Sequence, residues 1–122
     1  MADSSFIAEA LLKNKNLFEQ EDSIISPDLA LYELTNTVWK HQFLFKDVED
    51  GSQYISFLGD LIESGSIILV RPDWLLLKSA YEIAGKKKLS IYDAIFLALA
   101  FETGLELRSL DGKMMDIFRK NR

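Results

Sequence analysis

The longest unbroken apolar run of the chain extends from Ala94 to Phe101, directly after the acidic residue Asp93. A helix that is apolar on every side has to be buried all round. The run is also far shorter than the ~20 residues that cross a bilayer. We therefore predict a central buried helix in a water-soluble domain without membrane contact. Ser90 precedes it at N-cap spacing, which places Asp93 in its first turn.

Helical spacing of apolar positions recurs on both sides of this run. The expected helices cover residues 6–12, 27–43, 47–64 and 74–87, and a last basic helix covers 112–120. Ser26-Pro27-Asp28 predicts the start of the second of these helices, with Ser26 as N-cap and Pro27 as the first helical residue.

Short apolar segments alternate with these helices and are the candidate strands. They are residues 1–3, 23–26, 66–70 and 105–109. Strands that alternate with helices favour a parallel sheet with helices on both faces. We expect an α/β fold, namely a helix-dominated three-layer α/β/α sandwich with a short four-stranded parallel sheet. No linker or repeat divides the chain, so residues 1–122 are predicted to be a single domain.

The composition restricts the possible chemistry. The formal charge is 14 − 19 = −5, which argues against a protein that merely coats nucleic acid. If four carboxylates share one metal site, the remaining surface carries only −1, and a nucleic-acid substrate stays possible. The lack of cysteine excludes disulfides and Cys-ligated zinc, and fits the reducing cytoplasm that we expect for this chain. His41 is the only histidine, so a Ser-His-Asp site is not favoured.

Four carboxylates stand where α/β sheets keep their ligand sites, near strand ends and helix starts. They are Asp3, Glu33, Asp93 and Asp111. Each also has a simpler interpretation. Asp3 and Asp111 fit helix N-caps, Asp93 fits a capping box with Ser90, and Glu33 fits a solvated helix edge. Spacing alone does not decide between the two interpretations.

Four pieces of the sequence form a joint pattern. They are Asp3-Ser4-Ser5, the stretch from Pro27 to Glu33, Leu89-Ser90-Ile91-Tyr92-Asp93-Ala94, and Leu107 to Lys113. In this order they resemble the PIN-domain family of metal-dependent nucleases, especially the small VapC-type toxins, over nearly the whole chain. The resemblance implies that Asp3, Glu33, Asp93 and Asp111 form the acidic quartet of the catalytic site. It also places Ser109 at the family's Ser/Thr position, two residues before the last acid.

Clustered carboxylates raise one another's pKa values unless a counter-charge is present. Oxygen ligands without Cys or a nearby His favour Mg²⁺ or Mn²⁺ over Zn²⁺. We expect Asp3 and Asp93 to bind the metal directly, and Asp111 directly or through water. Glu33 is expected to bind a second ion or orient the attacking water, and Ser109 to bond water or an acid.

Basic residues that could contact RNA phosphates occur near both ends of the chain. They are Lys13, Lys15, Lys86, Lys87, Lys88, Lys113, Arg119, Lys120 and Arg122. Lys113 is the preferred substrate-binding candidate because it follows Asp111 so closely. Lys86 to Lys88 are explained more simply as charges that favour a helix C-terminus.

The resemblance implies a metal-dependent endoribonuclease, the toxin of a toxin–antitoxin pair, with RNA as substrate and an antitoxin protein as partner. The alternative is a catalytically silent domain of this fold that binds RNA or a protein. A receiver-like phosphoacceptor ranks last, because the strand ending at Val70 is followed by Arg71-Pro72 instead of an Asp.

A second apolar stripe on the expected helix 27–43 comprises Tyr32, Trp39 and Phe43, and Trp74 to Leu77 form another apolar run. Exposed apolar patches often mark protein contacts. We therefore predict a homodimer with a remaining apolar groove that receives an antitoxin helix. The alternative is that another helix of the same chain covers both stripes.

Overall fold

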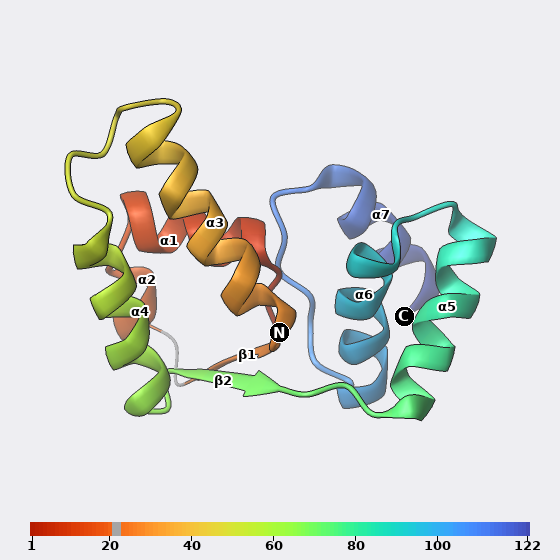
Figure 1. Ribbon diagram of the computed structural model, residues 1–122. Helices are drawn as coiled ribbons and strands as arrows, with labels where there is room; N and C mark the ends of the chain where they lie inside the picture. Colours follow the sequence, from red (N-terminus) through yellow and green to blue (C-terminus); the bar gives the residue numbers. More distant parts are fainter. Residues whose placement is uncertain (21–22) are drawn as a thin grey trace.

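Helices dominate the computed structural model, which describes residues 1–20 and 23–122 (Figure 1). The described residues form α1 (Ser4–Lys13), α2 (Leu17–Gln20), β1 (Ile24–Pro27), α3 (Leu29–Phe43), α4 (Ser52–Glu63), β2 (Ile67–Val70), α5 (Trp74–Lys87), α6 (Ile91–Thr103) and α7 (Gly112–Asn121). The predicted helix-dominated α/β class is confirmed. Within the described helices, none combines the length and the apolar character needed to span a bilayer.

The two regular strands, β1 and β2, pair in parallel with Ile24 opposite Ile67. Two further extended segments continue this pairing. The Ala2 N–H donates to the Ile25 carbonyl over 3.0 Å, and Ala2 forms an isolated parallel bridge with Arg108. The order across the sheet is therefore the segment around Arg108, the N-terminal segment, β1 and β2.

The expected strands over 1–3 and 105–109 are wrong as regular strands, because their mutual pairing is limited to that one bridge. The reason lies in the N-terminal segment. Asp3 is already the N-cap of α1, so the extended segment gives way to the helix directly after Ala2. The described sheet therefore has two regular strands and, on the β1 side, two extended segments. We had expected four strands.

The start of α3 also differs from the expectation. Pro27 is the last residue of β1, and Asp28 takes the N-cap position before Leu29. Ser26 is fully buried in the strand, and its hydroxyl donates to the Ala2 carbonyl over 2.7 Å. Ser26 thus fastens the N-terminal segment to β1 instead of capping a helix.

The expected helix over 47–64 begins later, at Ser52. Asp47 belongs to the turn after α3, where its carboxylate lies 2.8 Å from Nδ1 of His41. The Asp47 N–H also donates to the His41 carbonyl. The carboxylate of Asp50 accepts the Ser52 N–H over 3.0 Å at the start of α4. Polar residues before α4 therefore terminate one helix and start the next.

Two groups of helices pack on opposite faces of the sheet, as the parallel pattern predicted. In Figure 1, α1 to α4 lie on the left of the molecule and α5 to α7 on the right. Ile24 and Ile67 face a core cluster that includes buried residues of α1, α3 and α4. Ile25 and Val70 pack against a second cluster, built from α5 and α6. Every residue from Ala94 to Ala100 is buried, so α6 is the predicted central helix. Its N-terminus lies near the N-termini of α1 and α7, because the charges of their N-cap residues Asp3 and Asp111 act on Asp93.

Candidate active site

The backbone brings the two ends of the chain to one edge of the sheet. The Asp3 N–H donates to the Arg108 carbonyl over 3.1 Å, and the Arg108 N–H donates to the Met1 carbonyl over 2.9 Å. Because the two segments run parallel, they end at the same edge. Asp3 therefore lies beside Ser109, and α1 and α7 both begin close to this edge.

Asp3 is the most enclosed of the candidate acids, with only 7% of its surface exposed. Its Oδ1 accepts hydrogen bonds from the Ser5 hydroxyl over 2.7 Å and the Phe6 N–H over 3.1 Å. Its Oδ2 accepts one from the Ser109 hydroxyl. Charge-assisted bonds of this kind offset the cost of burying a carboxylate. They also hold Asp3 in one orientation.

Two serines join Asp3 to the segment that leads into α7. Ser109 Oγ accepts the Asp111 N–H over 3.0 Å, and Ser5 Oγ accepts the Leu110 N–H over 3.0 Å. Ser109 thus bonds an acid, one of the two roles predicted for it. Ser5 is a member of this network that our residue assignment omitted. The signal was available, since a hydroxyl two residues after an N-cap Asp can reach back to its carboxylate.

Asp93 stands half-buried in the first turn of α6, where its N–H donates to the Ser90 hydroxyl over 3.1 Å. Ser90 is therefore the predicted N-cap. Burial raises the pKa of the Asp93 carboxyl, and the negative charges of Asp111 and Asp3 raise it further. The Ser90 hydroxyl and the positive charge of Lys113 act in the opposite direction on this pKa. The negative charges of two other candidate acids therefore act on Asp93.

Asp111 is exposed and is the N-cap of α7, where its Oδ1 accepts the N–H groups of Lys113 and Met114 over 2.9 and 3.3 Å. Asp3 and Asp111 thus cap their helices as the simpler interpretation predicted, and of the capping box predicted for Asp93 the bond between its N–H and Ser90 is present. These roles do not exclude a shared site. Three helix N-termini, those of α1, α6 and α7, meet around these carboxylates. The positive ends of helix dipoles favour negative charge there, which partly offsets the mutual repulsion of the acids.

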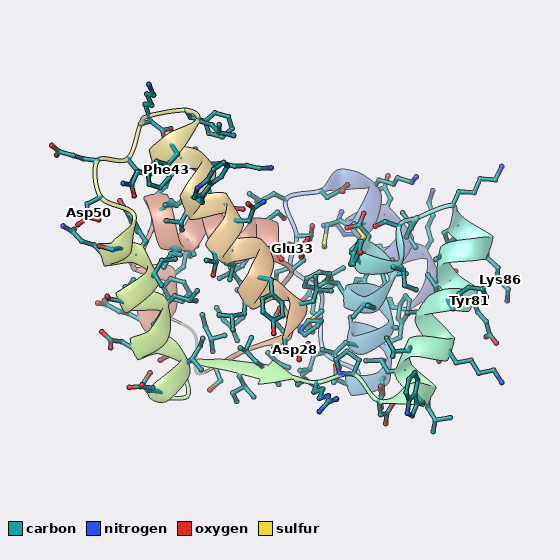
Figure 2. All side chains as sticks on the ribbon, viewed as in Figure 1. Asp28, Glu33, Phe43, Asp50, Tyr81 and Lys86 are labelled. Atoms are coloured by element: carbon teal, nitrogen blue, oxygen red, sulfur yellow. The ribbon has the colours of Figure 1, made fainter. Side chains whose placement is uncertain are left out.

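Glu33 reaches this region from α3. Its Oε1 accepts the Ser4 hydroxyl over 2.6 Å, and Ser4 is the first residue of α1 after Asp3. In Figure 2, Glu33 lies on the part of α3 that faces α6. The simpler interpretation, a solvated Glu33 at a helix edge, is therefore wrong, because its carboxylate is half-buried and bonded. Ser4 is the second site neighbour that our residue assignment omitted.

The structure brings the six predicted site residues into one region, through the bonds and charges described above. Across residues 1–20 and 23–122, however, no three acidic or histidine side chains are grouped tightly enough to hold a metal ion as they stand. Asp3 and Asp111 both accept backbone N–H groups of their own helices in this arrangement. Their oxygen-only donor set nevertheless matches the ligand preference of Mg²⁺ and Mn²⁺.

A profile of the PIN domain matches residues 1–119. The chain belongs to the PIN-domain family. It is also 32% identical over 125 aligned residues to a protein named ribonuclease VapC3 from Pyrobaculum aerophilum, and this alignment covers 97% of the chain and 93% of the relative. The resemblance noted from the motifs is therefore confirmed at the level of the family.

The raised pKa of Asp93 in this PIN domain predicts a pH-dependent stability. A carboxyl whose pKa is higher in the folded state lowers stability as the pH rises from the unfolded value, 3.8, through the folded value. Without metal, Asp93→Asn should therefore melt at a higher temperature than the wild type at neutral pH. The difference should disappear as the pH falls toward 3.8. Thermal melts across this range measure it, and a constant difference at all pH values would contradict the electrostatic explanation.

Proposed function

We propose that this PIN domain is a metal-dependent endoribonuclease. One observation carries the proposal: Asp3, Asp93 and Asp111 stand at three converging helix N-termini, in a chain similar to a protein named as a ribonuclease. Acids that served only to cap or start their own helices would have no need to lie together. Incubation of the purified protein with end-labelled RNA and with DNA of the same sequence tests the proposal. We expect internal cleavage of the RNA.

Asp3, Asp93 and Asp111 would hold Mg²⁺ or Mn²⁺, with Glu33 as a further ligand or as the group that orients the attacking water. When bound, the metal neutralises charge on the phosphodiester and lowers the pKa of a coordinated water. Asp93 is suited to the central role, because its carboxylate is only half-buried and faces the charges of both other acids.

The remaining residues of the network position these acids and the substrate. Ser109 and Ser5 donate to the two oxygens of Asp3 and so fix its orientation. Ser4 does the same for Glu33. Lys113 is exposed and close enough to Asp93 to lower the pKa of that carboxyl. We assign to Lys113 the binding of a phosphate beside the scissile bond.

We further propose that the nuclease acts as the toxin of a toxin–antitoxin pair. The support is its similarity to a protein named VapC3 over nearly all of both chains. The partner would then be an antitoxin that inserts an amphipathic helix into an apolar groove. Co-expression with the product of the adjacent gene should abolish RNA cleavage by the purified complex. If no neighbouring gene product inhibits cleavage, the toxin assignment is wrong while the nuclease assignment stands.

The second apolar stripe supports the proposed homodimer. Tyr32, Trp39 and Phe43 are 72%, 48% and 55% exposed, and Trp74 is 83% exposed. The rings of Trp39 and Phe43 lie 5.9 Å apart between centroids. Among the described residues, no other helix of the chain covers the first stripe or Trp74 and Leu75, whereas Leu76 of the second run is buried in the core by the same chain. An exposed aromatic surface of this kind favours a partner.

We expect a dimeric mass in light scattering at micromolar concentration. Trp39→Glu should shift the protein to a monomer, because a charge in an apolar interface loses its hydration without gaining a partner. Leu105→Glu is the control, since Leu105 is exposed but lies outside both stripes. A monomeric wild type would rule out the dimer.

A further inference from the structure

A hollow beside the candidate active site is lined mainly by lysines. It lies between the C-terminal end of α5 and one face of α7, and its charged lining consists of Lys86, Lys87, Lys88, Lys113 and Lys120 together with Asp116. The lysines outnumber the acid by five to one in a chain whose net charge is −5. Figure 2 shows Lys86 near this end of α5. Positive charge is therefore concentrated in this hollow, although the chain as a whole carries a net negative charge.

The α7 side of this hollow is a regular helix face. Lys113, Asp116, Ile117 and Lys120 recur at intervals of three and four residues, so they share one side of the helix. The α5 side comes from its last turn and from the C-cap Lys88, whose φ of 54° is left-handed. This reversal of the backbone ends the helix and leads the chain toward Ser90 and α6. The hollow therefore adjoins the N-terminus that carries Asp93.

Favourable helix-dipole interactions account for only part of this lysine set. Lysines in the last turns of α5 and α7 interact well with a helix C-terminus. Lys113, in contrast, lies in the first turn of α7, where the dipole disfavours a positive charge. Its charge instead acts on Asp93, whose pKa it lowers. Lys113 thus belongs both to the hollow and to the acidic site, and connects the two.

We propose that this hollow holds the phosphate backbone of the substrate RNA next to the scissile bond. This inference rests on the proposed nuclease function and extends it to a second region of the surface. Five ammonium groups around one hollow repel one another, and an anionic occupant removes that repulsion. Neutralisation of phosphates by lysines is the main source of affinity for nucleic acids.

The connection to the acidic site favours RNA over an acidic peptide as the occupant. A phosphodiester at Asp93 continues into neighbouring phosphates, which have to cross the adjacent surface. That surface begins at Lys113. An acidic peptide in the same hollow would bring its carboxylates toward the carboxylates of Asp93 and Asp111. It would have no phosphodiester to place at these acids.

The test compares two double variants that remove the same charge. Lys87→Gln with Lys120→Gln neutralises one lysine on each wall of the hollow. Lys40→Gln with Lys78→Gln neutralises two exposed cations, on α3 and α5, at positions that do not line it and that are not candidate phosphate contacts. Fluorescence anisotropy of single-stranded RNA in EDTA reports binding without cleavage. Hydrolysis of bis(p-nitrophenyl) phosphate with Mn²⁺ reports the acidic site with a substrate too small to reach the hollow.

We expect the Lys87/Lys120 variant to bind RNA about tenfold more weakly. The slope of log K against log salt concentration should also become shallower by roughly 1.4, because each lost phosphate contact with a single strand removes about 0.7. The Lys40/Lys78 variant should stay within about twofold of the wild type. Hydrolysis of the small substrate should be unchanged in both variants.

Equal weakening in both variants, or none in the Lys87/Lys120 variant, would overturn the inference. It would also be overturned if the Lys87/Lys120 variant lost binding of a polyglutamate peptide and kept its affinity for RNA. If the wild type binds RNA through this hollow but hydrolyses neither RNA nor the small substrate, the nuclease proposal fails and the binding site stands.

Discussion

Asp93→Asn should reduce RNA cleavage by roughly a hundredfold or more, because a loss of 1.36 kcal/mol in transition-state stabilisation already costs tenfold and metal sites supply several kcal/mol. The substitution keeps the size of the side chain but removes the charge at the junction of the three helix N-termini. Initial rates on end-labelled RNA at saturating Mg²⁺ or Mn²⁺ measure the effect. Melting temperatures of the same samples show whether the fold is retained.

Asp73→Asn is a matched control for this experiment. The Asp73 carboxylate caps α5 and accepts the Leu76 N–H over 2.8 Å. Asp73 lies beside the C-terminal end of α6, near Leu99 and Thr103, whereas Asp93 is in the first turn of that helix. Asp73→Asn therefore tests the loss of a carboxylate at a helix N-terminus without touching the acidic cluster. We expect full activity and a small change in stability. Wild-type cleavage by Asp93→Asn would leave Asp93 with a capping role only, and would favour a silent RNA-binding domain.

Removal of divalent metal should abolish cleavage and lower the melting temperature. A ligand that binds only the folded state at 100 times its Kd stabilises it by about 2.7 kcal/mol. For a domain of this size, that corresponds to a shift on the order of 10 °C. EDTA should therefore eliminate both the activity and the shift, and added Mg²⁺ or Mn²⁺ should restore them.

Asp93→Asn again serves as the comparison, because a protein without this acid should show a much smaller metal-dependent shift. The metal is assigned to the wrong place if the variant shows the same shift as the wild type. Cleavage that persists in EDTA, together with an unchanged melting temperature in millimolar metal, would rule out the proposed metal dependence.

The sequence predicted the longer helices and the central helix α6, but not the short α2, because the signals of the longer helices are local. The apolar run after Asp93 could only be a buried helix, and the spacing over 74–87 gave the bounds of α5. The start of α3 was missed for a non-local reason. Ser26 and Pro27 look like a helix start, yet Ser26 is bonded to Ala2, a contact between segments that no local pattern contains.

The candidate site shows the same division. The acids were predicted from motifs. The sequence could not indicate that Asp3 and Asp111 cap their helices and also lie close to Asp93. That property depends on three helices beginning at one place. The roles of Ser4 and Ser5 were missed because each hydroxyl bonds a partner that only the fold brings near, Glu33 in one case and the Leu110 N–H in the other. The sequence also does not show that α7 faces Lys86 to Lys88.

The bond between Asp3 and Ser109 joins residues 106 positions apart, and this has a consequence for the order of events during synthesis. A ribosome releases the N-terminus first, so Asp3 and α1 emerge long before Ser109, Asp111 and α7. Closure of so long a loop is a late step in folding. The candidate site is therefore incomplete for most of translation, and a nascent or truncated chain without Ser109 and Asp111 cannot assemble it.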